Sequence, residues 1–239
     1  MPDTLPLLAL RNAVIFPGSI FPITIGRDKS IKLIEDAHKS NSLIGAVPQN
    51  DVSVEDPALD DLFPFGTVAR IIKTFEMPDG TISAVLQGLK RFEIEDVVSS
   101  EPYLRAHVRY LEEFEANPED PEIKVIADSL KEKASAIIKS SSFAPKEAAN
   151  AVKSIEDFNF LVNFIATTID VENFFDKVEL LKYEDLKVRA MKLLNVLDTQ
   201  VELLKIKQEI NSKVKNEIDQ QQREYYLNNQ LRTIQEELG

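Results

Sequence analysis

Few residues of the chain have the types and spacing that catalysis requires. The sequence has no cysteine and only two histidines, His38 and His107, which lie far apart. Thiol catalysis, disulfides and cysteine-based zinc sites are therefore excluded, which fits a reducing compartment. Because His107 alternates with small and apolar residues in a predicted strand, we expect a surface or core role for it rather than general-base catalysis.

Adjacent carboxylates are the other group that could act on a substrate. They occur at Asp60-Asp61, Glu112-Glu113 and Glu236-Glu237. A catalytic pair needs a cleft and a different environment for each carboxylate, so in a chain with 40 acidic residues these pairs are expected on the solvated surface. The run Ser140-Ser141-Ser142, shortly before Pro145, is interpreted as a turn between helices.

The known motifs for nucleotide binding and hydrolysis are missing. The sequence contains no G-x-x-x-x-G-K-[ST] phosphate loop, no G-x-S-x-G elbow and no H-E-x-x-H helix. We therefore expect no catalytic, cofactor-binding or metal-ligating residue in this chain. We also expect it neither to bind ATP nor to cleave peptides.

The charge distribution restricts the partners. The net charge is -12, and residues 1–184 hold 31 of the 40 acidic and 19 of the 28 basic residues, which accounts for all of it. Such acidity disfavours nucleic acid, because that binding depends on neutralising phosphates. No apolar run approaches the roughly 18 residues of a membrane span, and the N-terminus lacks the order of a signal peptide. The sequence predicts a cytoplasmic protein without a membrane partner.

Glycine and proline separate a strand-rich part from a helical part. All 12 prolines lie at or before Pro145, and six of the seven glycines lie at or before Gly88, so nothing from Lys146 to Leu238 would break a helix. This predicts an α+β fold. Short β-branched or alternating runs predict strands at Leu5–Leu10, Phe21–Ile25, Leu43–Val47, Thr67–Phe75, Thr81–Leu86, Arg91–Val98 and Tyr103–Leu111.

Local signals refine the strand-rich part. Asp28 is the expected N-cap of a helix that continues through His38 with apolar residues at helical spacing. The acidic segment Gln49–Leu62 is expected to be an exposed loop. Met77-Pro78-Asp79-Gly80 predicts a tight turn, so the strands that flank it should form a hairpin.

Three segments are predicted: 1–116 as a β-rich subdomain, 117–184 as a helical subdomain, and 185–239 as a long connecting helix. Asn117–Pro121 contains two prolines and marks the first junction, so limited proteolysis should cut there or in the acidic loop. Pro145 is expected in the first turn of a helix. Helices are also predicted at Asp157–Thr168 and Val171–Leu181, with core residues Phe158, Leu161, Ile165, Phe174, Phe175 and Val178.

Apolar residues recur at helical spacing from Tyr183 to Leu238. The stripe is expected to run from Leu186 through Leu204, to continue through Ile206, Ile210, Val214 and Ile218, and to end at Leu227, Leu231, Ile234 and Leu238. Much of this segment should form one helix. A helix of this length cannot bury its whole stripe against a small domain, so its distal end should need a partner or the continuing chain.

The order and spacing of several motifs resemble the N-terminal domain of bacterial Lon ATP-dependent proteases. The matching residues are Leu5-Pro6-Leu7-Leu8-Ala9-Leu10-Arg11-Asn12, Phe16-Pro17-Gly18, Gly66-Thr67-Val68-Ala69-Arg70-Ile71, Gly88-Leu89-Lys90-Arg91 and Pro102-Tyr103-Leu104. The segment Gln222-Arg223-Glu224-Tyr225-Tyr226-Leu227 is similar to the helix that leads into the Lon ATPase module. Asn12 stands where the family usually has Asp, and the likeness is loose between Glu112 and Lys153.

The resemblance implies a β-rich PUA-like subdomain, a helical subdomain and a long helix that joins a hexameric AAA+ protease. It places the Walker motifs, the Ser-Lys dyad, ATP and Mg beyond Gly239. The implied role is non-catalytic: the chain would recruit unfolded or damaged proteins in protein quality control through apolar contacts. The alternatives are an assembly scaffold that binds no substrate, and a PUA-like RNA-binding module, which the acidity disfavours.

Four residues near the end of the long helix are candidate contacts to substrate or to a neighbouring subunit. They are Tyr225, Tyr226, Leu227 and Leu231. Helices usually bury such stripes, so packing against the ATPase module or another subunit is one reading. The other is that the tyrosines, which are amphipathic and have only two side-chain torsions, hold unfolded segments.

Overall fold

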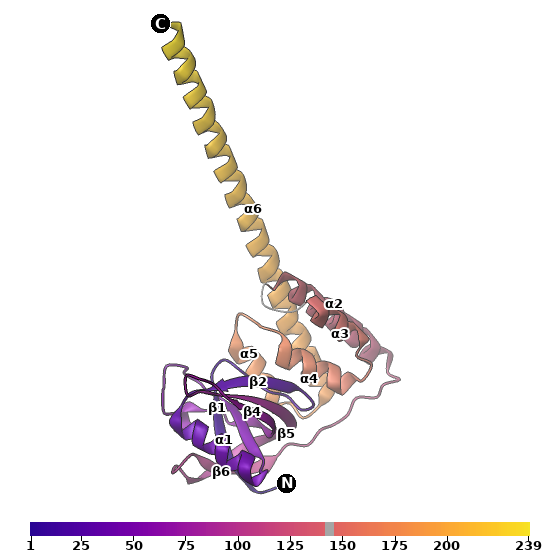
Figure 1. The fold of residues 1–239 in the computed structure, drawn as a ribbon. Coiled ribbons are helices and arrows are strands. Elements are labelled where there is room, and N and C mark those ends of the chain that lie inside the picture. Colours follow the sequence, from indigo (N-terminus) through magenta and orange to yellow (C-terminus); the bar gives the residue numbers. More distant parts are fainter. Residues whose placement is uncertain (142–145) are drawn as a thin grey trace.

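The computed structural model describes residues 1–141 and 146–239 and consists of a head and one projecting helix (Figure 1). The strands are β1 (Thr4–Leu10), β2 (Ile20–Ile25), β3 (Ile44–Pro48), β4 (Phe65–Glu76), β5 (Ile82–Ser99) and β6 (Arg105–Tyr110). The helices are α1 (Asp28–Ser40), α2 (Pro121–Ser140), α3 (Lys146–Ser154), α4 (Phe158–Thr168), α5 (Phe174–Glu179) and α6 (Leu186–Leu238). Strands followed by helices confirm the predicted α+β class.

The strands form a barrel with one additional strand at its edge. The sheet order is β2-β5-β4-β3-β1-β6, and the pairing of β5 with β6 closes the ring. Closure depends on the length of β5, whose first half pairs with β2 and whose second half pairs with β6. Strand β2 therefore lies outside the closed ring and pairs with β5 alone.

The prediction of separate strands at Thr81–Leu86 and Arg91–Val98 was wrong, because Gly88 does not interrupt β5. Its pairing with β4 continues across this position, with a bulge between Val68 and Ala69. A Cβ at Gly88 would lie 2.4 Å from the carbonyl oxygen of Phe16. Glycine is needed there for close backbone approach rather than for a turn.

The predicted N-cap of α1 was also wrong. Arg27 is the cap residue, and Asp28 lies in the first helical turn, where its charge still favours the helix dipole. The predicted hairpin between β4 and β5 is confirmed. The Met77 N–H donates to the Thr81 carbonyl at 2.9 Å, and Gly80 takes a φ of 84°.

The acidic segment Gln49–Leu62 is only partly the exposed loop that was predicted. Its two ends are buried and form a bridge with each other, and Leu59–Asp61 make one 3-10 turn. Gln49 is buried because its side chain binds the loop's own backbone, donating to the carbonyls of Asp51 and Val54. The middle of the segment is exposed.

Side-chain caps begin the helices of the second part. Asp120 accepts from the Glu122 N–H with Pro121 at the start of α2, so the proline-rich junction passes directly into a helix. Asp157 caps α4. The predicted roles of Ser142 and Pro145 lie outside the described residues. Phe175 is 52% exposed instead of buried, and its ring packs edge-on against Phe63, with 5.6 Å between centroids.

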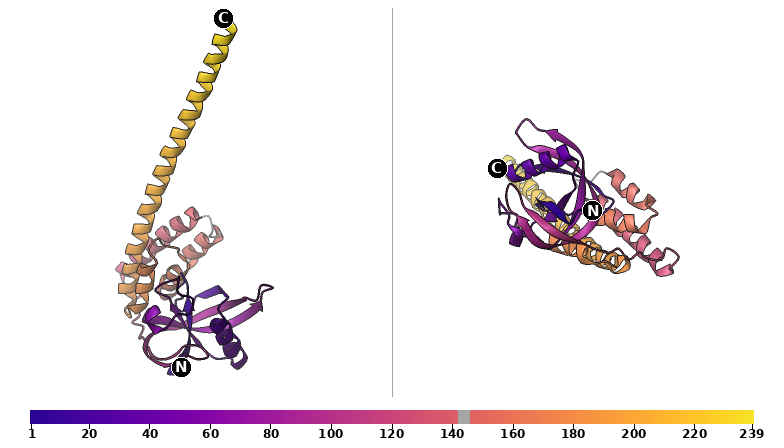
Figure 2. Two further views of the ribbon diagram at one scale, coloured as in Figure 1. Left: turned by 90° about the vertical axis from the view of Figure 1, so that its left-hand side faces the viewer. Right: turned by 90° about the horizontal axis from the view of Figure 1, so that it is seen from below.

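Helix α6 has 53 residues and begins at a cap formed by Asp185. Its buried side chains end at Leu197, and the rest of the helix projects from the head as a single rod (Figures 1 and 2). The predicted continuous stripe was wrong. Leu197 and Ile206 are nine residues apart, which is about two and a half helical turns, so Ile206 lies on the side of the helix opposite Leu197. Within the part of the chain that the structure describes, no helix is long and apolar enough to cross a membrane.

Candidate functional site

One buried ionic cluster joins the barrel to the base of α6. The Glu113 carboxylate accepts from Arg91 of β5 at 2.5 Å and from Arg189 of α6. Both arginine side chains are completely buried. Arg91 also donates to the carbonyls of Leu181 and Tyr183, at 2.6 and 2.7 Å.

The electrostatics of this cluster are those of a structural ion pair. Burial alone would raise the pKa of Glu113, but the hydrogen bonds and charges of Arg189 and Arg91 outweigh burial and hold the pKa below its usual value. The carboxylate is thus ionised and held by two cations, so it is no general acid. The sequence-based placement of Glu113 on the solvated surface was wrong. The sequence contained one indication of a buried ion pair. Arg189 directly precedes Ala190 in a segment whose apolar residues, such as Leu186, are expected to be buried, so its charge would need an acidic partner.

The remaining candidates for chemistry lie apart from one another. His107 is exposed, and its Nδ1 lies 2.9 Å from the Thr4 hydroxyl. Asp61 accepts from the Ala58 N–H, and Glu236 pairs with Arg232 on the exposed end of α6. Among the described residues, no group of three or more acidic or histidine side chains could hold a metal ion.

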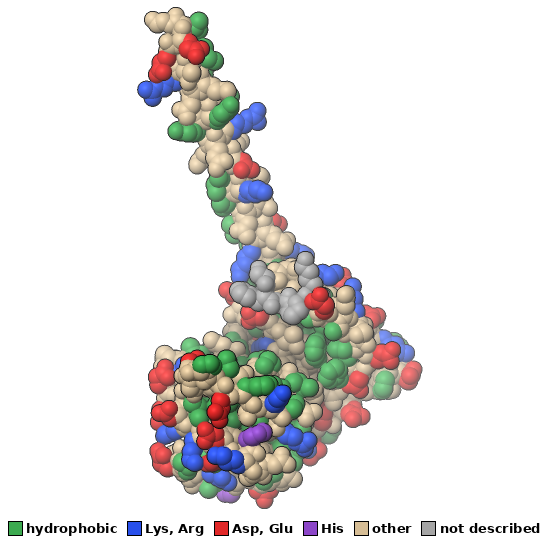
Figure 3. Space-filling view, in the orientation of Figure 1, with side chains coloured by type: hydrophobic (Ala, Val, Ile, Leu, Met, Phe, Trp, Pro, Cys, Tyr) green, Lys and Arg blue, Asp and Glu red, His purple; other side chains and the backbone are tan. Residues whose placement is uncertain are grey.

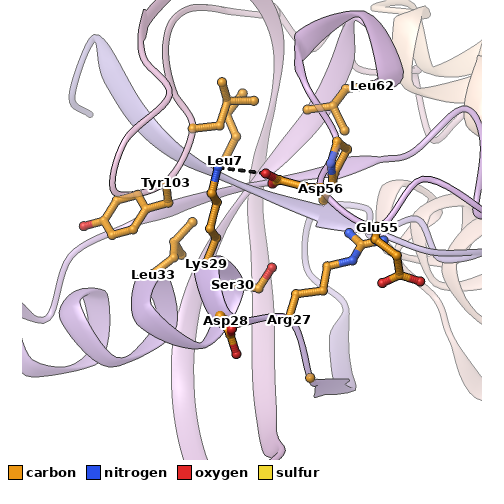
Figure 4. A pocket seen from close by; sticks show the side chains of 14 residues that line it. Leu7, Arg27, Asp28, Lys29, Ser30, Leu33, Glu55, Asp56, Leu62 and Tyr103 are labelled. Atoms are coloured by element: carbon orange, nitrogen blue, oxygen red, sulfur yellow. Dashed lines mark ion pairs between the residues drawn. The ribbon is translucent and has the colours of Figure 1, made fainter.

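A pocket of about 420 Å³ lies between the start of α1, strand β1 and the acidic loop (Figure 4). Leu7, Leu33 and Leu62 contribute its apolar surface. At its edge the Lys29 side chain points toward Asp56, with 2.9 Å between Nζ and Oδ2, and the same amine lies 3.1 Å from Glu101. These ion pairs hold the acidic loop against α1, so the Lys29 amine and the Asp56 carboxylate are already used in structure.

A larger apolar groove of about 770 Å³ separates β2 from the helices. We call it the β2 groove. Its apolar lining comes from Ile20, Phe21, Pro22, Ile137, Ile138, Phe164, Ile169, Val171 and Leu204. Ile20 is 62% exposed, so this side of the groove is open to an incoming group. The groove has the size and apolar character of a binding site for small groups or side chains.

Hydrogen bonds fix the floor of the β2 groove. The Thr167 hydroxyl accepts from the Phe16 N–H at 3.1 Å and donates to the Ser19 hydroxyl at 3.0 Å. The Lys177 amine donates to the carbonyls of Thr167 and Ile169, at 2.9 and 2.7 Å. Burial lowers the pKa of Lys177 to about 8. The end of α4 is thus held against β2, which makes the groove a preformed feature.

More apolar side chains are exposed on β4, which is separated from β2 by β5. Ile72, Phe75 and Met77 are about half exposed at the far end of β4 and in the turn that follows. Figure 3 shows hydrophobic side chains on the face of the head that adjoins the helices. The sequence analysis did not identify the β2 groove, because its walls come from strand and helix segments more than 100 residues apart.

The four predicted contact residues lie on the exposed, distal part of α6. Tyr225 and Tyr226 are 71% and 61% exposed, and Leu227 and Leu231 are also exposed. Tyr226 accepts a hydrogen bond from Gln230 at 2.9 Å. They lie on the rod, well away from the β2 groove on the head, and their role stays a prediction.

Comparison with known proteins identifies the family. The family model described as the ATP-dependent protease La (LON) substrate-binding domain matches residues 4–199. A Lon protease of Flavobacterium johnsoniae is 47% identical over 239 residues, and one of Cytophaga hutchinsonii is 41% identical over 238. Each match covers 100% of this chain and 29% of the relative, so the chain spans less than a third of the length of these relatives.

Solved structures agree with the fold. The N-terminal domain of the Mycobacterium avium complex Lon protease has a TM-score of 0.64 at 22% identity, over 82% of this chain and 98% of that one. The Lon N-terminal domain protein from Xanthomonas campestris has a TM-score of 0.59 at 18% identity, over 80% and 97%. With a family model that matches most of its length, the chain belongs to the family of Lon protease substrate-binding domains.

Proposed function

We propose that this chain recruits unfolded or damaged proteins to a Lon-type ATP-dependent serine protease and that it does so through apolar contacts in the β2 groove. In this proposal the chain is non-catalytic. ATP and Mg act in the AAA+ module, and a Ser-Lys dyad cleaves the substrate in another part of the longer protein. The setting is protein quality control in the cytoplasm, without a nucleic-acid or membrane partner.

The observation that carries the proposal is the preformed apolar groove with Ile20 exposed at its side. Unfolded proteins differ from folded ones in the apolar side chains that they expose, so a recruiting surface must offer apolar contacts of its own. A groove with a fixed floor accepts such side chains without first having to order itself, which lowers the entropic cost of binding.

Oligomeric assembly would strengthen weak binding. A single groove holds few side chains, so we expect modest affinity for one segment. Six copies in a hexamer would bind several segments of the same unfolded chain, and avidity would raise the overall affinity without a new contact.

A scaffold without substrate binding is the second candidate. The exposed apolar side chains of α6, such as Ile210 and Val214, favour it, because an isolated helix normally buries such residues against a partner. RNA binding is disfavoured by the net charge of -12. Direct binding of an unfolded polypeptide by this chain separates recruitment from scaffolding.

The test is the substitution Ile20→Asp, with Val125→Asp as the matched control. Both side chains are mostly exposed, at 62% and 65%, but Val125 lies on α2 and does not line the β2 groove. Fluorescence anisotropy would measure binding of a labelled, reduced and carboxymethylated protein that cannot fold. Because a bound apolar segment would bury Ile20, we expect Ile20→Asp to weaken binding roughly fivefold to tenfold and the control to have little effect.

Two results would contradict the proposal. If the unmodified chain does not bind the unfolded protein, the proposal that this chain recruits substrates is wrong, and the scaffold function is favoured. If both substitutions weaken binding equally, the loss reflects added negative charge, and the β2 groove is not the site.

A further inference from the structure

Strand β2 has one paired edge and one free edge. It pairs with β5 from Ile20↔Gln87 to Ile25↔Ile82, and it has no strand partner on its other side within the described residues. A bulge starts this pairing: the Gly18 N–H donates to the Gly88 carbonyl, and the Gly88 N–H donates to the Ser19 carbonyl, both at 3.0 Å. Gly18 takes a φ of 80°, as the first residue of such a bulge must.

The bulge determines which backbone groups face outward. In an antiparallel pair, hydrogen-bonded and non-hydrogen-bonded positions alternate. Since Ser19 is hydrogen-bonded to Gly88, Phe21, Ile23 and Ile25 direct their backbone groups to β5. Ile20, Pro22 and Thr24 direct theirs to the free edge, where no other described residue forms a backbone hydrogen bond with them.

The free edge opens into the β2 groove. Ser19, Ile20, Phe21 and Pro22 line the groove on one side, and Phe164 and Ile169 line it on the other. The rim carries Asp170, an exposed carboxylate, and the ion pair between Lys207 and Glu172 at 2.8 Å. An extended segment along this edge would find backbone partners in the strand, apolar surface beside it and an acidic group for a basic side chain.

We propose that an unfolded polypeptide segment binds as an added strand along the free edge of β2, with apolar side chains in the β2 groove. This rests on the proposed recruiting function and specifies how the substrate is held. Strand addition gains affinity from main-chain hydrogen bonds, while pockets beside the strand select the side chains. Recognition of the backbone suits a site that must accept many sequences with little in common.

Pro22 makes a second copy of this chain a poor occupant. At the free edge, Pro22 offers a backbone carbonyl but no N–H. If two copies of β2 paired with Pro22 opposite Pro22, both hydrogen bonds at the centre of the pair would be missing. A guest segment with an ordinary residue there would still donate to the Pro22 carbonyl. Proline at a free edge thus opposes self-association of folded copies and leaves the edge open to an unfolded chain.

The variant Thr24→Pro tests the edge directly. The Thr24 N–H faces outward, so proline removes this donor and blocks the edge without removing a hydrogen bond to β5. Thr24→Val is the matched control, because valine keeps the N–H and the β-branched shape. The probe is a fluorescein-labelled ten-residue peptide of alternating valine and lysine, measured by anisotropy. We expect Thr24→Pro to raise the Kd about tenfold and Thr24→Val to change it less than about twofold.

A modified peptide gives a second measurement that needs no protein variant. The same peptide N-methylated at its central residues keeps its side chains but loses its backbone donors, and we expect it to bind the unmodified chain at least about tenfold more weakly. Hydrogen exchange should show the Ile20 and Thr24 amides exchanging rapidly in the free protein and slowly with the parent peptide. Thermal unfolding of each variant would verify that it is folded.

The outcomes separate this inference from the function on which it rests. Equal binding of the methylated and parent peptides, or no protection at Ile20 and Thr24, would overturn strand addition while leaving recruitment by the groove intact. If neither the peptide nor the carboxymethylated protein binds the unmodified chain, strand addition and the proposed function are both wrong.

Discussion

The Glu113 carboxylate binds Arg91 of β5 and Arg189 of α6, and so connects two parts of the chain that are far apart in sequence. Two buried guanidinium groups share this one carboxylate, and the Nε of each has no hydrogen-bond partner among the described residues. Removal of the negative charge would leave both cations buried without their counter-ion. Loss of one partner from a buried ion pair costs far more than loss of a surface pair.

We predict that Glu113→Gln lowers the free energy of unfolding by about 2–4 kcal/mol at pH 7. Glu112→Gln, an exposed neighbour, should change it by less than about 0.5 kcal/mol. Because the folded-state pKa of Glu113 is lowered, its stabilisation is present above the unfolded-state pKa and disappears as the pH falls through the folded-state value. Urea unfolding from pH 7 down to pH 3 should therefore show the difference between the unmodified chain and Glu113→Gln shrinking in acid. A constant difference would contradict this account.

Sequence alone could not distinguish Glu112 from Glu113. Both are acidic, both follow β6, and the nearest basic residue in sequence, Arg109, is almost equally far from each. Their environments differ because β6 pairs with β5 and thereby brings Arg91 to one of them, which is a consequence of tertiary structure. The same limit hid the β2 groove, whose walls meet only after the helices pack on the barrel.

At the scale of elements, composition and periodicity predicted most of the fold. The helices after Lys146 were predictable because this stretch lacks helix breakers and its apolar residues have helical spacing. The errors arose where one residue has two possible roles. Glycine often interrupts a strand. Here Gly88 instead allows the backbone of β5 to approach Phe16 closely, so β5 is one long strand.

Helix α6 is anchored only at its base. Its fully buried residues lie between Leu186 and Leu197, Val201 and Leu204 are still partly buried against the core, and every residue from Lys205 onward is exposed. Isolated helices are marginally stable in water, so most of the stability of α6 should come from its packed end. The exposed aromatic pair therefore lies on a part of the helix that a partner would stabilise.

We predict that replacing Tyr225 and Tyr226 by Ser in the longer Lon-type protein proposed above weakens formation of the proposed hexamer, because large exposed side chains on a helix are normally buried by a partner. Gln221→Ser with Gln222→Ser is the matched control, one turn earlier on the same rod. Analytical ultracentrifugation and assays of small-peptide and unfolded-protein cleavage would report the effects. An intact hexamer with normal peptide cleavage but slow degradation of unfolded protein would instead assign the pair to recruitment. No change in any of the three would contradict both readings.

At the scale of the whole molecule, the strand-rich and helical parts share a core. Val14 and Phe16, from the connection between β1 and β2, are buried in the same cluster as Leu161, Val162 and Ile165 of α4. The Phe16 N–H also donates to the Thr167 hydroxyl. The division into 1–116, 117–184 and 185–239 stays a prediction, and the shared core leads us to expect that these segments unfold together.

The shared core predicts that cutting the connection between the two parts does not separate them. Residues 115–119 are largely exposed and include Pro118, so a specific protease site inserted between Ala116 and Asn117 should be cleaved without disturbing a helix or strand. We expect the fragments to co-elute in size-exclusion chromatography and to unfold in one thermal transition, because the cluster around Phe16 and the bridge from Glu113 to Arg189 hold them together.

The variant Phe16→Ala should lose about 3–5 kcal/mol of stability. Once cleaved, it should release the fragments at lower urea than the cleaved parent. Fragments that separate spontaneously and unfold at different temperatures would show that the two parts are stable without each other.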